Sequence, residues 1–370
     1  MAFAEGGPAA LEAMTEQGFD VVVTDMKMPG MDGAELLSRV RERSPQTIRL
    51  VLSGHAEQGS IMRVLDQSHQ YLSKPCDPEV LKATIDRAVQ LRRLLEGDEL
   101  RALVSRMGSL PSIPRLYDGV MAELGKPQPS VRRVAGIIES DMSMTAKILK
   151  VVNSAFFGLR RSVGNVDQAV GFLGLETISA LVLSAGIFKR FEGVDLPGFS
   201  PDALWAHGNR TPAFARVIAV AATADKAVVA QAFTAGLIHD IGRLALASQA
   251  PKQYGEVLTR LCEQGGVRAG EVETELLGAT SAQVGAYLLG LWGLPDTVVE
   301  AVAHHEAPTG WVGSGFGVVG IVHVAHALAE APAACDAAPE AHGVDPSFLD
   351  RAGVANRWPE WIEACRALSA

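Results

Sequence analysis

The sequence predicts two folded units in series, an α/β unit with a parallel sheet followed by an all-helical bundle. Up to about residue 77, short β-rich runs such as Val21–Val23 and Arg49–Leu52 alternate with helical patterns, which is typical of strands joined by crossover helices. From Pro78 onward no strand pattern returns, and apolar residues recur at helical spacing. The length of 370 residues is enough for two or three domains.

The overall composition excludes several classes of protein. No run approaches the roughly 18 uncharged apolar residues of a membrane span, and no secretion signal follows Met1, so we expect a cytoplasmic protein without membrane contact. The 4 cysteines are widely spaced, which disfavours a disulfide framework or a zinc knuckle. The net charge is −9, and the only basic residues after position 270 are Arg351, Arg357 and Arg366. Direct nucleic-acid binding is therefore not expected.

Three polar side chains are expected at one edge of the predicted sheet. Asp25 follows the first apolar run, Ser53 ends the second, and Lys74 follows the third. The carboxyl ends of parallel strands meet at one edge, where open α/β sheets bind their ligands. A carboxylate, a hydroxyl and an amine together suit phosphoryl transfer to the carboxylate.

This constellation resembles the receiver domain of two-component response regulators, a flavodoxin-like fold, over residues 1–95. The resemblance implies a sensor histidine kinase as the phosphate donor, and receivers of this family can form homodimers. It assigns the phosphoacceptor to Asp25, the phosphoryl-binding hydroxyl to Ser53, the aromatic switch to Tyr71 and the balancing positive charge to Lys74.

The match departs from the family at the N-terminus. Receivers begin with a strand that ends in two acidic residues, then a helix and a second strand, and Met1 falls near the end of that second strand. The first strand, its helix and the acidic pair are therefore expected to be absent. Asp25 and one carbonyl would have to hold Mg²⁺ alone, so we expect weak Mg²⁺ binding and inefficient phosphorylation. A start codon placed too late, or a shortened chain, is one explanation; a receiver reduced to a docking surface is the other.

A helix and a linker are predicted to join the two units. Asp77 before Pro78 is typical of a helix start, and the helix is expected to run to about Gly97. Its apolar stripe can pack on its own sheet or pair with a partner helix. The charged, less regular residues 96–106 are predicted to be a linker.

Helical patterns fill the rest of the chain. Apolar residues at helical spacing predict helices around 116–124, 131–138 and 177–191. Asp141 is expected to cap another helix, which stops at Gly158. Short connections without a fixed repeat favour a compact bundle over a solenoid.

The order of these helices, with Asp141, Asn153-Ser154 and the turn at Gly174, resembles the HDOD domain. This helical signalling module is related to the HD phosphohydrolases. The resemblance covers residues 107–370, with the core at about 107–310 and a C-terminal helical extension after it.

HD phosphohydrolases, including the HD-GYP cyclic dinucleotide phosphodiesterases, hold metal ions with an upstream His, a His-Asp pair, further histidines and a distal Asp. A bound metal lowers the pKa of water, so that hydroxide can attack phosphorus. The resemblance assigns the upstream position to His207, the pair to His239 and Asp240, the paired histidines to His304 and His305, and the distal position to His326.

Several positions differ from the enzymes. Thr280 and Ser281 stand where an Asp and a ligand His are usual, and a hydroxyl is a poor substitute for imidazole. His326 replaces the distal Asp, and no Gly-Tyr-Pro follows His305. We therefore expect no bound metal, no firm cofactor and no catalytic residue. The remaining cluster is then a relic, made of His207, His239, Asp240, His304, His305 and His326.

The histidines also have other interpretations. His239, between apolar residues, can be a core histidine that is hydrogen-bonded to Asp240 or a carbonyl. His323 and His326 are three apart on one helix face, which would permit metal chelation together with His304.

Three classes of function follow. The favoured one is a response regulator whose HDOD unit is a non-catalytic adaptor, gated by the receiver and binding a downstream signalling protein or a nucleotide. The second is a metal-dependent phosphohydrolase that acts on a cyclic dinucleotide. The third is a structural assembly scaffold. In the first class, phosphorylation of Asp25 would move Ser53 and Tyr71 and change the face that contacts helix 78–97.

Overall fold

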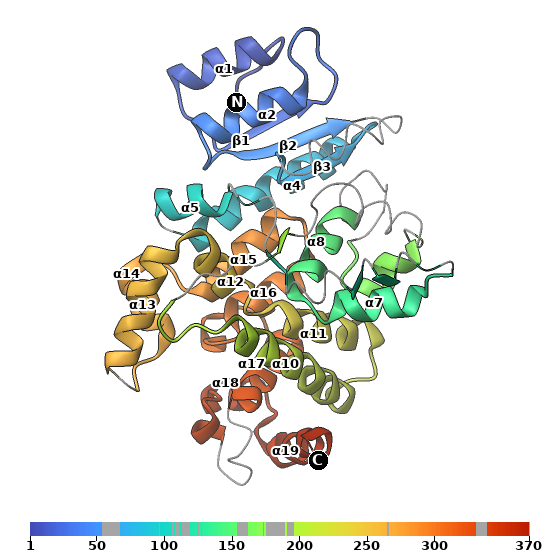
Figure 1. Ribbon diagram of the computed structural model, residues 1–370, viewed down its shortest axis with the longest axis vertical. Coiled ribbons are helices and arrows are strands. Elements are labelled where there is room, and N and C mark those ends of the chain that lie inside the picture. The colour runs from blue at the N-terminus through green and yellow to red at the C-terminus, as the bar shows by residue number, and fades with distance from the viewer. Residues whose placement is uncertain are drawn as a thin grey trace.

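The α/β unit and the helical bundle are both present in a computed structural model, with the N-terminus in the first and the C-terminus at the far end of the second (Figure 1). The structure describes residues 1–53, 67–95, 97–105, 107, 111–112, 119–120, 122–123, 126, 128–153, 162–172, 174, 189–190, 196–264, 266–330 and 339–369. Both predicted units, and hence the predicted fold class, are confirmed.

A parallel sheet of three strands forms the centre of the α/β unit, in the order β1-β2-β3. Helices α1 and α2 cover one face of this sheet, and α4 covers the other (Figure 1). Its elements are α1 (Gly7–Glu16), β1 (Val21–Asp25), α2 (Gly33–Arg43), β2 (Ile48–Ser53), β3 (Gln70–Ser73) and α4 (Pro78–Leu91).

The predicted start of α4 is confirmed, because the Asp77 side chain accepts a hydrogen bond from the amide of Glu79. The helix ends at Leu91, earlier than expected, and a 3₁₀ turn follows at Arg92–Leu94. Its apolar stripe serves two surfaces, since α4 contacts both β1 and helix α15 (Ser281–Leu291) of the bundle.

The prediction of an irregular linker at 96–106 was wrong. Residues Asp98–Ser105 form helix α5, which also packs on α15. Leu100, Leu103 and Val104 recur at helical spacing and contact the core, and Val104 is fully buried. The apolar face of this segment therefore packs against the bundle, while Asp98 is exposed and Arg101 donates to the carbonyl of Leu95.

Helices dominate the second unit, and the cap predicted at Asp141 is confirmed by hydrogen bonds from the amides of Ser143 and Met144. The expectation that no strand returns was wrong in one detail, since two-residue strands β4 (Pro111–Ser112) and β5 (Lys189–Arg190) pair in parallel. The helices are α7 (Val131–Glu139), α8 (Met142–Val152), α10 (Pro201–Ala222), α11 (Lys226–Ile238), α12 (Ile241–Gln249), α13 (Pro251–Gln264), α14 (Ala269–Leu277), α15, α16 (Asp296–His304), α17 (Gly317–Glu330), α18 (Pro346–Arg351) and α19 (Trp358–Ser369).

Most of the helix predicted around 116–124, most of the helix predicted at 177–191, and the stop at Gly158 lie outside the described residues. Residues Lys189–Arg190 of the second predicted helix form strand β5, so the prediction was wrong there. Helices α15 and α17 are buried along nearly their whole length and form the centre of the bundle. Among the described residues, no helix is long and apolar enough to cross a membrane.

Helices α12 and α15 are in backbone contact. A Cβ added to Gly242 would lie 1.8 Å from the carbonyl oxygen of Ser281 and 2.7 Å from the amide nitrogen of Gly285. We predict that Gly242→Ala lowers the free energy of unfolding by about 1–3 kcal/mol, because the two backbones must separate. Thermal unfolding checks this.

Gly136→Ala is the matched control, because a Cβ added there, within α7, meets nothing within 4 Å. It should leave stability unchanged or raise it by about 0.5–1 kcal/mol, since alanine is the better helix former. Equal effects of the two substitutions would contradict the proposed close contact.

Candidate functional site

The predicted receiver residues meet at one edge of the sheet. Asp25 ends β1, Ser53 ends β2, and Lys74 directly follows β3. The Lys74 ammonium forms an ion pair with Asp25 Oδ2, and both side chains are partly exposed. The side chains of Ser53 and Tyr71 lie outside the described part of the structure, so their predicted roles stay predictions.

The surroundings of Asp25 bear on the predicted weak Mg²⁺ binding. Among the described residues, no group of three potential metal ligands includes Asp25. A hard cation such as Mg²⁺ needs oxygen ligands, and the oxygen of Asp25 that contacts Lys74 is already neutralised by an ammonium. The weak Mg²⁺ binding remains a prediction.

A second constellation lies inside the bundle, where three imidazoles converge from three helical segments. His207 lies on α10, His239 follows α11, and His326 lies on α17. The Nε2 atoms of His207 and His239 are 3.1 Å apart, and His326 Nδ1 lies 3.1 Å from the first and 3.0 Å from the second. The three nitrogens therefore form a nearly equilateral triangle.

Two further donor atoms border this triangle. Asp240 Oδ2 lies 3.4 Å from His239 Nε2 and 3.7 Å from His207 Nε2. The ring of His305 lies 4.9 Å, between centroids, from the rings of His239 and His326. Asp240 Oδ2 and His305 Nε2 are buried and have no hydrogen-bond partner among the described residues. Buried polar atoms without partners are rare and call for an explanation.

Backbone carbonyls fix the protonation of two of these rings. His239 Nδ1 lies 2.7 Å from the carbonyl oxygen of Gly236, and His305 Nδ1 lies 2.8 Å from that of Val302. A carbonyl only accepts, so each Nδ1 carries the proton and donates it. The Nε2 lone pairs of His239 and His305 then point into the cluster, as they do in histidines that ligate metals.

Burial keeps the cluster neutral apart from its carboxylate. It lowers the pKa of His239 to about 3, although Asp240 opposes this, and it also lowers the pKa values of His207 and His326. Burial works against the charged form of Asp240, but His239 and Arg243 outweigh it and hold the pKa of Asp240 below its usual range. At neutral pH His207, His239 and His326 therefore offer uncharged nitrogens beside one carboxylate.

The donor set fits a transition metal. Metal–N bonds of about 2.1 Å place two nitrogens about 3 Å apart at the right angles of octahedral coordination and about 3.4 Å apart at tetrahedral angles, so the spacing of the imidazole triangle is closer to the octahedral value. A single hydrogen-bonded proton could not account for three mutual contacts at this distance. Imidazoles with one carboxylate suit Zn, Fe, Co or Ni, whereas Mg²⁺ prefers oxygen ligands.

His304 and His323, which the sequence also suggested, lie outside the cluster. Among the described residues, the potential metal-binding groups contain His305 but not His304. Neighbours on a helix project about 100° apart, so only one of the two can face inward. His323 Nδ1 donates to the carbonyl of His305, and its Nε2 accepts from the amide of Asp345. The prediction that His304, His323 and His326 together chelate a metal was therefore wrong.

Thr280 and Ser281 serve the start of α15. The Thr280 side chain accepts from the amide of Gln283, whose side chain in turn accepts from the Thr280 amide, which is a complete capping box. The amide of Ser281 donates to the buried carboxylate of Glu273 over 2.7 Å. Helix capping thus accounts for these two positions.

A cavity of about 640 Å³ adjoins the cluster and includes His207 and Asp240 in its wall. Two arginines that sequence reasoning missed, Arg210 and Arg243, also line it, among apolar residues of α10 and α13. Arg243 Nε lies 3.7 Å from Asp240 Oδ1. The sequence could have pointed to Arg243, because it stands three residues after Asp240 and so lies on the same side of the helix. Glu273 and Glu330 line the same cavity, so charges of both signs lie beside the metal-binding set.

This geometry defines a signalling protein with a receiver and an HD-related helical unit, and comparison with known proteins agrees. The HDOD domain model matches residues 110–308, and the response regulator receiver domain model matches residues 1–86. The chain belongs to the HDOD family and carries a receiver domain, as predicted, which makes it a response regulator of a two-component system.

Individual relatives match parts of the chain. An uncharacterised protein of Treponema pallidum is 26% identical over 208 residues, which cover 56% of this chain and 40% of the relative. The transcriptional regulator NtrC of Klebsiella pneumoniae is 34% identical over 86 residues, 23% of this chain and 18% of NtrC. The chain thus spans less than half the length of either relative.

Solved structures share the fold. The MmoQ response regulator from Methylococcus capsulatus has a TM-score of 0.51 at 24% identity, covering 66% of this chain and 98% of MmoQ. A virulence factor from Campylobacter jejuni has a TM-score of 0.55 at 20% identity, covering 73% and 97%. At these identities the likeness concerns the fold.

The neutral, buried imidazoles predict a stability that depends on pH. The pKa of His239 is about 3 in the folded chain, below the ordinary value of 6.5, so its contribution is complete above pH 6.5 and is lost as the pH falls. In EDTA, acidification from pH 6.5 to 5 should cost about 2 kcal/mol for this one histidine. Denaturant unfolding at the two pH values measures it.

The variant His239→Gln should reduce the pH dependence by about one proton. Gln90→Ala, on the exposed surface of α4, is the control and should retain the full dependence. The same slope in His239→Gln as in the parent chain would show that this ring titrates normally in the folded state.

Proposed function

We propose that the receiver controls the HDOD unit of this response regulator, and that the HDOD unit acts by binding a downstream signalling protein. A sensor histidine kinase would be the phosphate donor to Asp25. One observation carries the proposal: helix α15 contacts the receiver at its C-terminal end and, nearer its N-terminal end, the segment that bears Asp240.

The receiver contacts the C-terminal end of α15 through α4 and β3. A Cβ added to Gly290 would lie 2.5 Å from the Leu91 side chain, so the two are tightly packed. Gln70 Nε2 donates to the carbonyl of Gly290 over 3.3 Å. Arg87 forms an ion pair of 2.6 Å with Asp296 at the start of α16. Apolar packing, a hydrogen bond and an ion pair thus join the two units.

A buried polar network reinforces this junction. The carbonyl of Ser105, at the end of α5, accepts from the guanidinium of Arg49 and from His69 Nε2. His69 Nδ1 accepts from the Arg49 amide, which leaves the ring proton on Nε2. The Ser105 hydroxyl lies 3.3 Å from the hydroxyl of Tyr287 on α15. A change in β2 or β3 therefore reaches α15 through hydrogen bonds.

Burial lowers the pKa of Arg49 to about 9, so its charge is costly in this position. Carbonyls of the receiver share that charge with the helix end of α5, whose partial negative charge favours a cation. Such a network loses several interactions at once when its geometry shifts, which suits a junction with two discrete states.

The other contact of α15 leads to the histidine cluster. Gly242 stands two residues after Asp240, and its backbone touches α15 at Ser281 and Gly285. Because both surfaces are backbone, a shift of α15 must move the start of α12 and with it the Asp240 carboxylate. The adjacent cavity would change shape at the same time.

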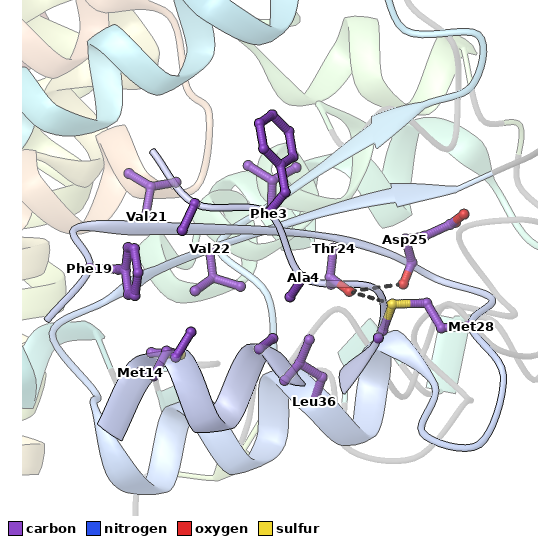
Figure 2. Close-up of a pocket in the computed structure, with 15 residues that line it drawn as sticks. Phe3, Ala4, Met14, Phe19, Val21, Val22, Thr24, Asp25, Met28 and Leu36 are labelled. Carbon is purple, nitrogen blue, oxygen red and sulfur yellow. Dashed lines mark hydrogen bonds between the residues drawn. The ribbon is translucent and has the colours of Figure 1, made fainter. Parts of the chain in front are cut away.

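Phosphorylation would act at the carboxyl ends of the receiver strands, where Asp25 lies (Figure 2), whereas Gln70, which contacts α15, lies at the start of β3. Lys74 pairs with Asp25 in the unmodified chain and follows β3, whose Gln70 contacts α15. A phosphoryl group on Asp25 offers Lys74 a new, more negative partner. The change at Lys74 would then bias β3 and α15 between two positions.

Binding rather than catalysis is favoured by the replaced positions. Thr280 and Ser281 cap a helix where the enzymes supply an Asp and a ligand His. Glu273, held by the Ser281 amide, has its pKa raised to about 7 by burial. This side of the cavity is therefore built around helix capping, and offers no imidazole.

A metal-dependent phosphohydrolase is the second candidate, favoured by the donor set described above. His207, His239, Asp240 and His326 would hold one transition metal, with His305 beside it. A bound metal supplies an activated water at neutral pH. Arg210 and Arg243 would bind and orient an anionic phosphoester in the adjoining cavity.

Coupling through α15 can be measured by hydrogen exchange. Phosphorylation by acetyl phosphate, verified by mass, should change amide exchange in α15 and at the start of α12. Asp25→Asn should abolish the response, and Gln70→Ala should weaken it because the bond to Gly290 is lost. Gln90→Ala, an exposed Gln on α4, is the matched control. Unchanged exchange in fully phosphorylated protein would refute the gating.

Metal binding has a matched test in two adjacent histidines. The chelator-treated chain should bind Co²⁺ or Zn²⁺, and His326→Gln should weaken binding at least tenfold because it removes one corner of the triangle. His305→Gln should also weaken it, whereas His304→Gln should not. Equal effects at positions 304 and 305 would contradict the assignment. Titration calorimetry measures the affinities.

Turnover separates the two candidates. The metal-loaded chain is expected to leave a cyclic dinucleotide intact over hours, as a binding module would. Hydrolysis that depends on metal and disappears in Asp240→Asn would instead establish the phosphohydrolase. Chromatography of the nucleotide products provides the readout.

A further inference from the structure

A further cavity of the bundle lies beside the C-terminal half of α10, and none of its described lining residues belongs to the histidine cluster. Its volume of about 540 Å³ is within the range of about 300–1,000 Å³ that holds small molecules. Helices α10 and α11 lie side by side (Figure 1) and form most of its described wall. The end of α7 and residues 165 and 167 complete that wall.

Four charged side chains line this cavity, two of each sign. Glu139 and Asp167 are acidic, and Arg216 and Lys226 are basic. Glu139 is partly buried, and the other three are exposed. Within the described parts of the chain, none of the four side chains forms an ion pair or a hydrogen bond. Charges of opposite sign therefore surround one cavity without pairing with each other.

Glu139, at the end of α7, has the greatest need of a partner. Burial raises the pKa of its carboxyl group to about 7, the charge of Asp167 adds to the rise, and Arg216 works against it. A carboxylate in this position has lost part of its hydration and has gained no hydrogen bond, which costs free energy. A positively charged group that enters the cavity would supply the missing partner.

Apolar side chains lie between the charged ones. Val229 and Phe233 are one turn apart on α11, so they are on the same face of that helix. Val220 of α10 lines the same cavity and is 62% exposed. Ligand cavities typically combine such an apolar surface with a few polar groups that fix the orientation of the ligand.

We propose that this cavity binds a small zwitterion, an amino acid or a dipeptide with a large apolar side chain. The ammonium of the ligand would pair with Glu139 and Asp167, and its carboxylate with Arg216 and Lys226. Hydrogen bonds between ionised partners are about twice as strong as those between neutral ones. The apolar side chain of the ligand would cover the valines and the phenylalanine. This inference does not depend on the function proposed for the histidine cluster or the receiver.

The balance of charge selects a ligand with both signs. An anion would leave Glu139 without a partner and would be repelled by it, whereas a cation without a carboxylate would leave Arg216 and Lys226 unpaired. Two charges of each sign in the wall match a ligand of zero net charge. The cavity also favours a small molecule over a folded partner, because a stable protein interface buries about 800 Å² on each side.

Capped dipeptides test the proposal on the whole chain. The probe is L-leucyl-L-phenylalanine, and its two controls are the N-acetylated form, which lacks the ammonium, and the C-terminal amide, which lacks the carboxylate. Titration calorimetry should show saturable binding of the probe and at least tenfold weaker binding of each control. L-Phenylalanine, titrated in the same way, distinguishes an amino acid from a dipeptide as the preferred ligand. If neither zwitterion binds, or if a capped form binds as tightly as the probe, the proposal is wrong.

Matched variants test the same site from the protein side. Glu139→Gln and Arg216→Gln each remove one charge from the wall of the cavity and should weaken probe binding at least tenfold. The controls Glu256→Gln on α13 and Arg132→Gln on α7 remove exposed charges outside the cavity and should change binding by less than threefold. Thermal unfolding confirms that each variant folds.

Combining variants with capped peptides separates direct pairing from a general disturbance of the fold. Glu139→Gln should lose the preference for the free ammonium over the acetylated form and keep the preference for the free carboxylate over the amide. Arg216→Gln should show the reverse. A Glu139→Gln variant that folds and keeps its full preference for the free ammonium would overturn the assignment. If that variant does not fold, the three peptides and Arg216→Gln still decide.

Discussion

The contact between the backbones of α12 and α15 is the constraint on which the rest of the structure depends. Gly242 has no space for a side chain, so the helix that begins after the His-Asp pair is held at a fixed distance from α15. The opposite end of α15 contacts Leu91 and Gln70 of the receiver unit. A single buried helix therefore sets the position of the Asp240 carboxylate relative to the receiver, and close-packed interiors transmit such displacements.

The buried polar groups are placed around this helix. Burial of the His239 and Asp240 pair is costly unless the groups find partners. Carbonyls satisfy the Nδ1 atoms of His239 and His305, while the inward-facing lone pairs meet one another at distances that suit a metal. At the receiver junction, carbonyls satisfy Arg49 in the same way. In both networks the burial of polar groups costs free energy unless their hydrogen bonds keep one well-defined geometry. A switch between discrete states requires this combination.

Part of this arrangement could be predicted from the sequence. The carboxyl ends of parallel strands meet at one edge, so the order of Asp25 and Lys74 along the chain was enough to predict their contact. Helix α5 was not predicted, because its many charged residues made the helical spacing of Leu100, Leu103 and Val104 less apparent. The burial of Arg49 could not be foreseen, since arginine is seldom buried without partners, and one of its carbonyl partners, at Ser105, lies 56 residues further along the chain.

The sequence by itself determined which side chains are available to the two sites, the order of strands and helices in the receiver unit, and the HDOD family. It could do so because strands, helices and motifs are local patterns. Only the tertiary structure decided which groups meet. His304 and His305 are neighbours in the chain, yet helical phase turns only His305 toward His239. His326 joins the cluster because α17 packs beside α10 and α11. A ligand set drawn from three helices depends on how those helices pack, and that packing is a property of the whole chain.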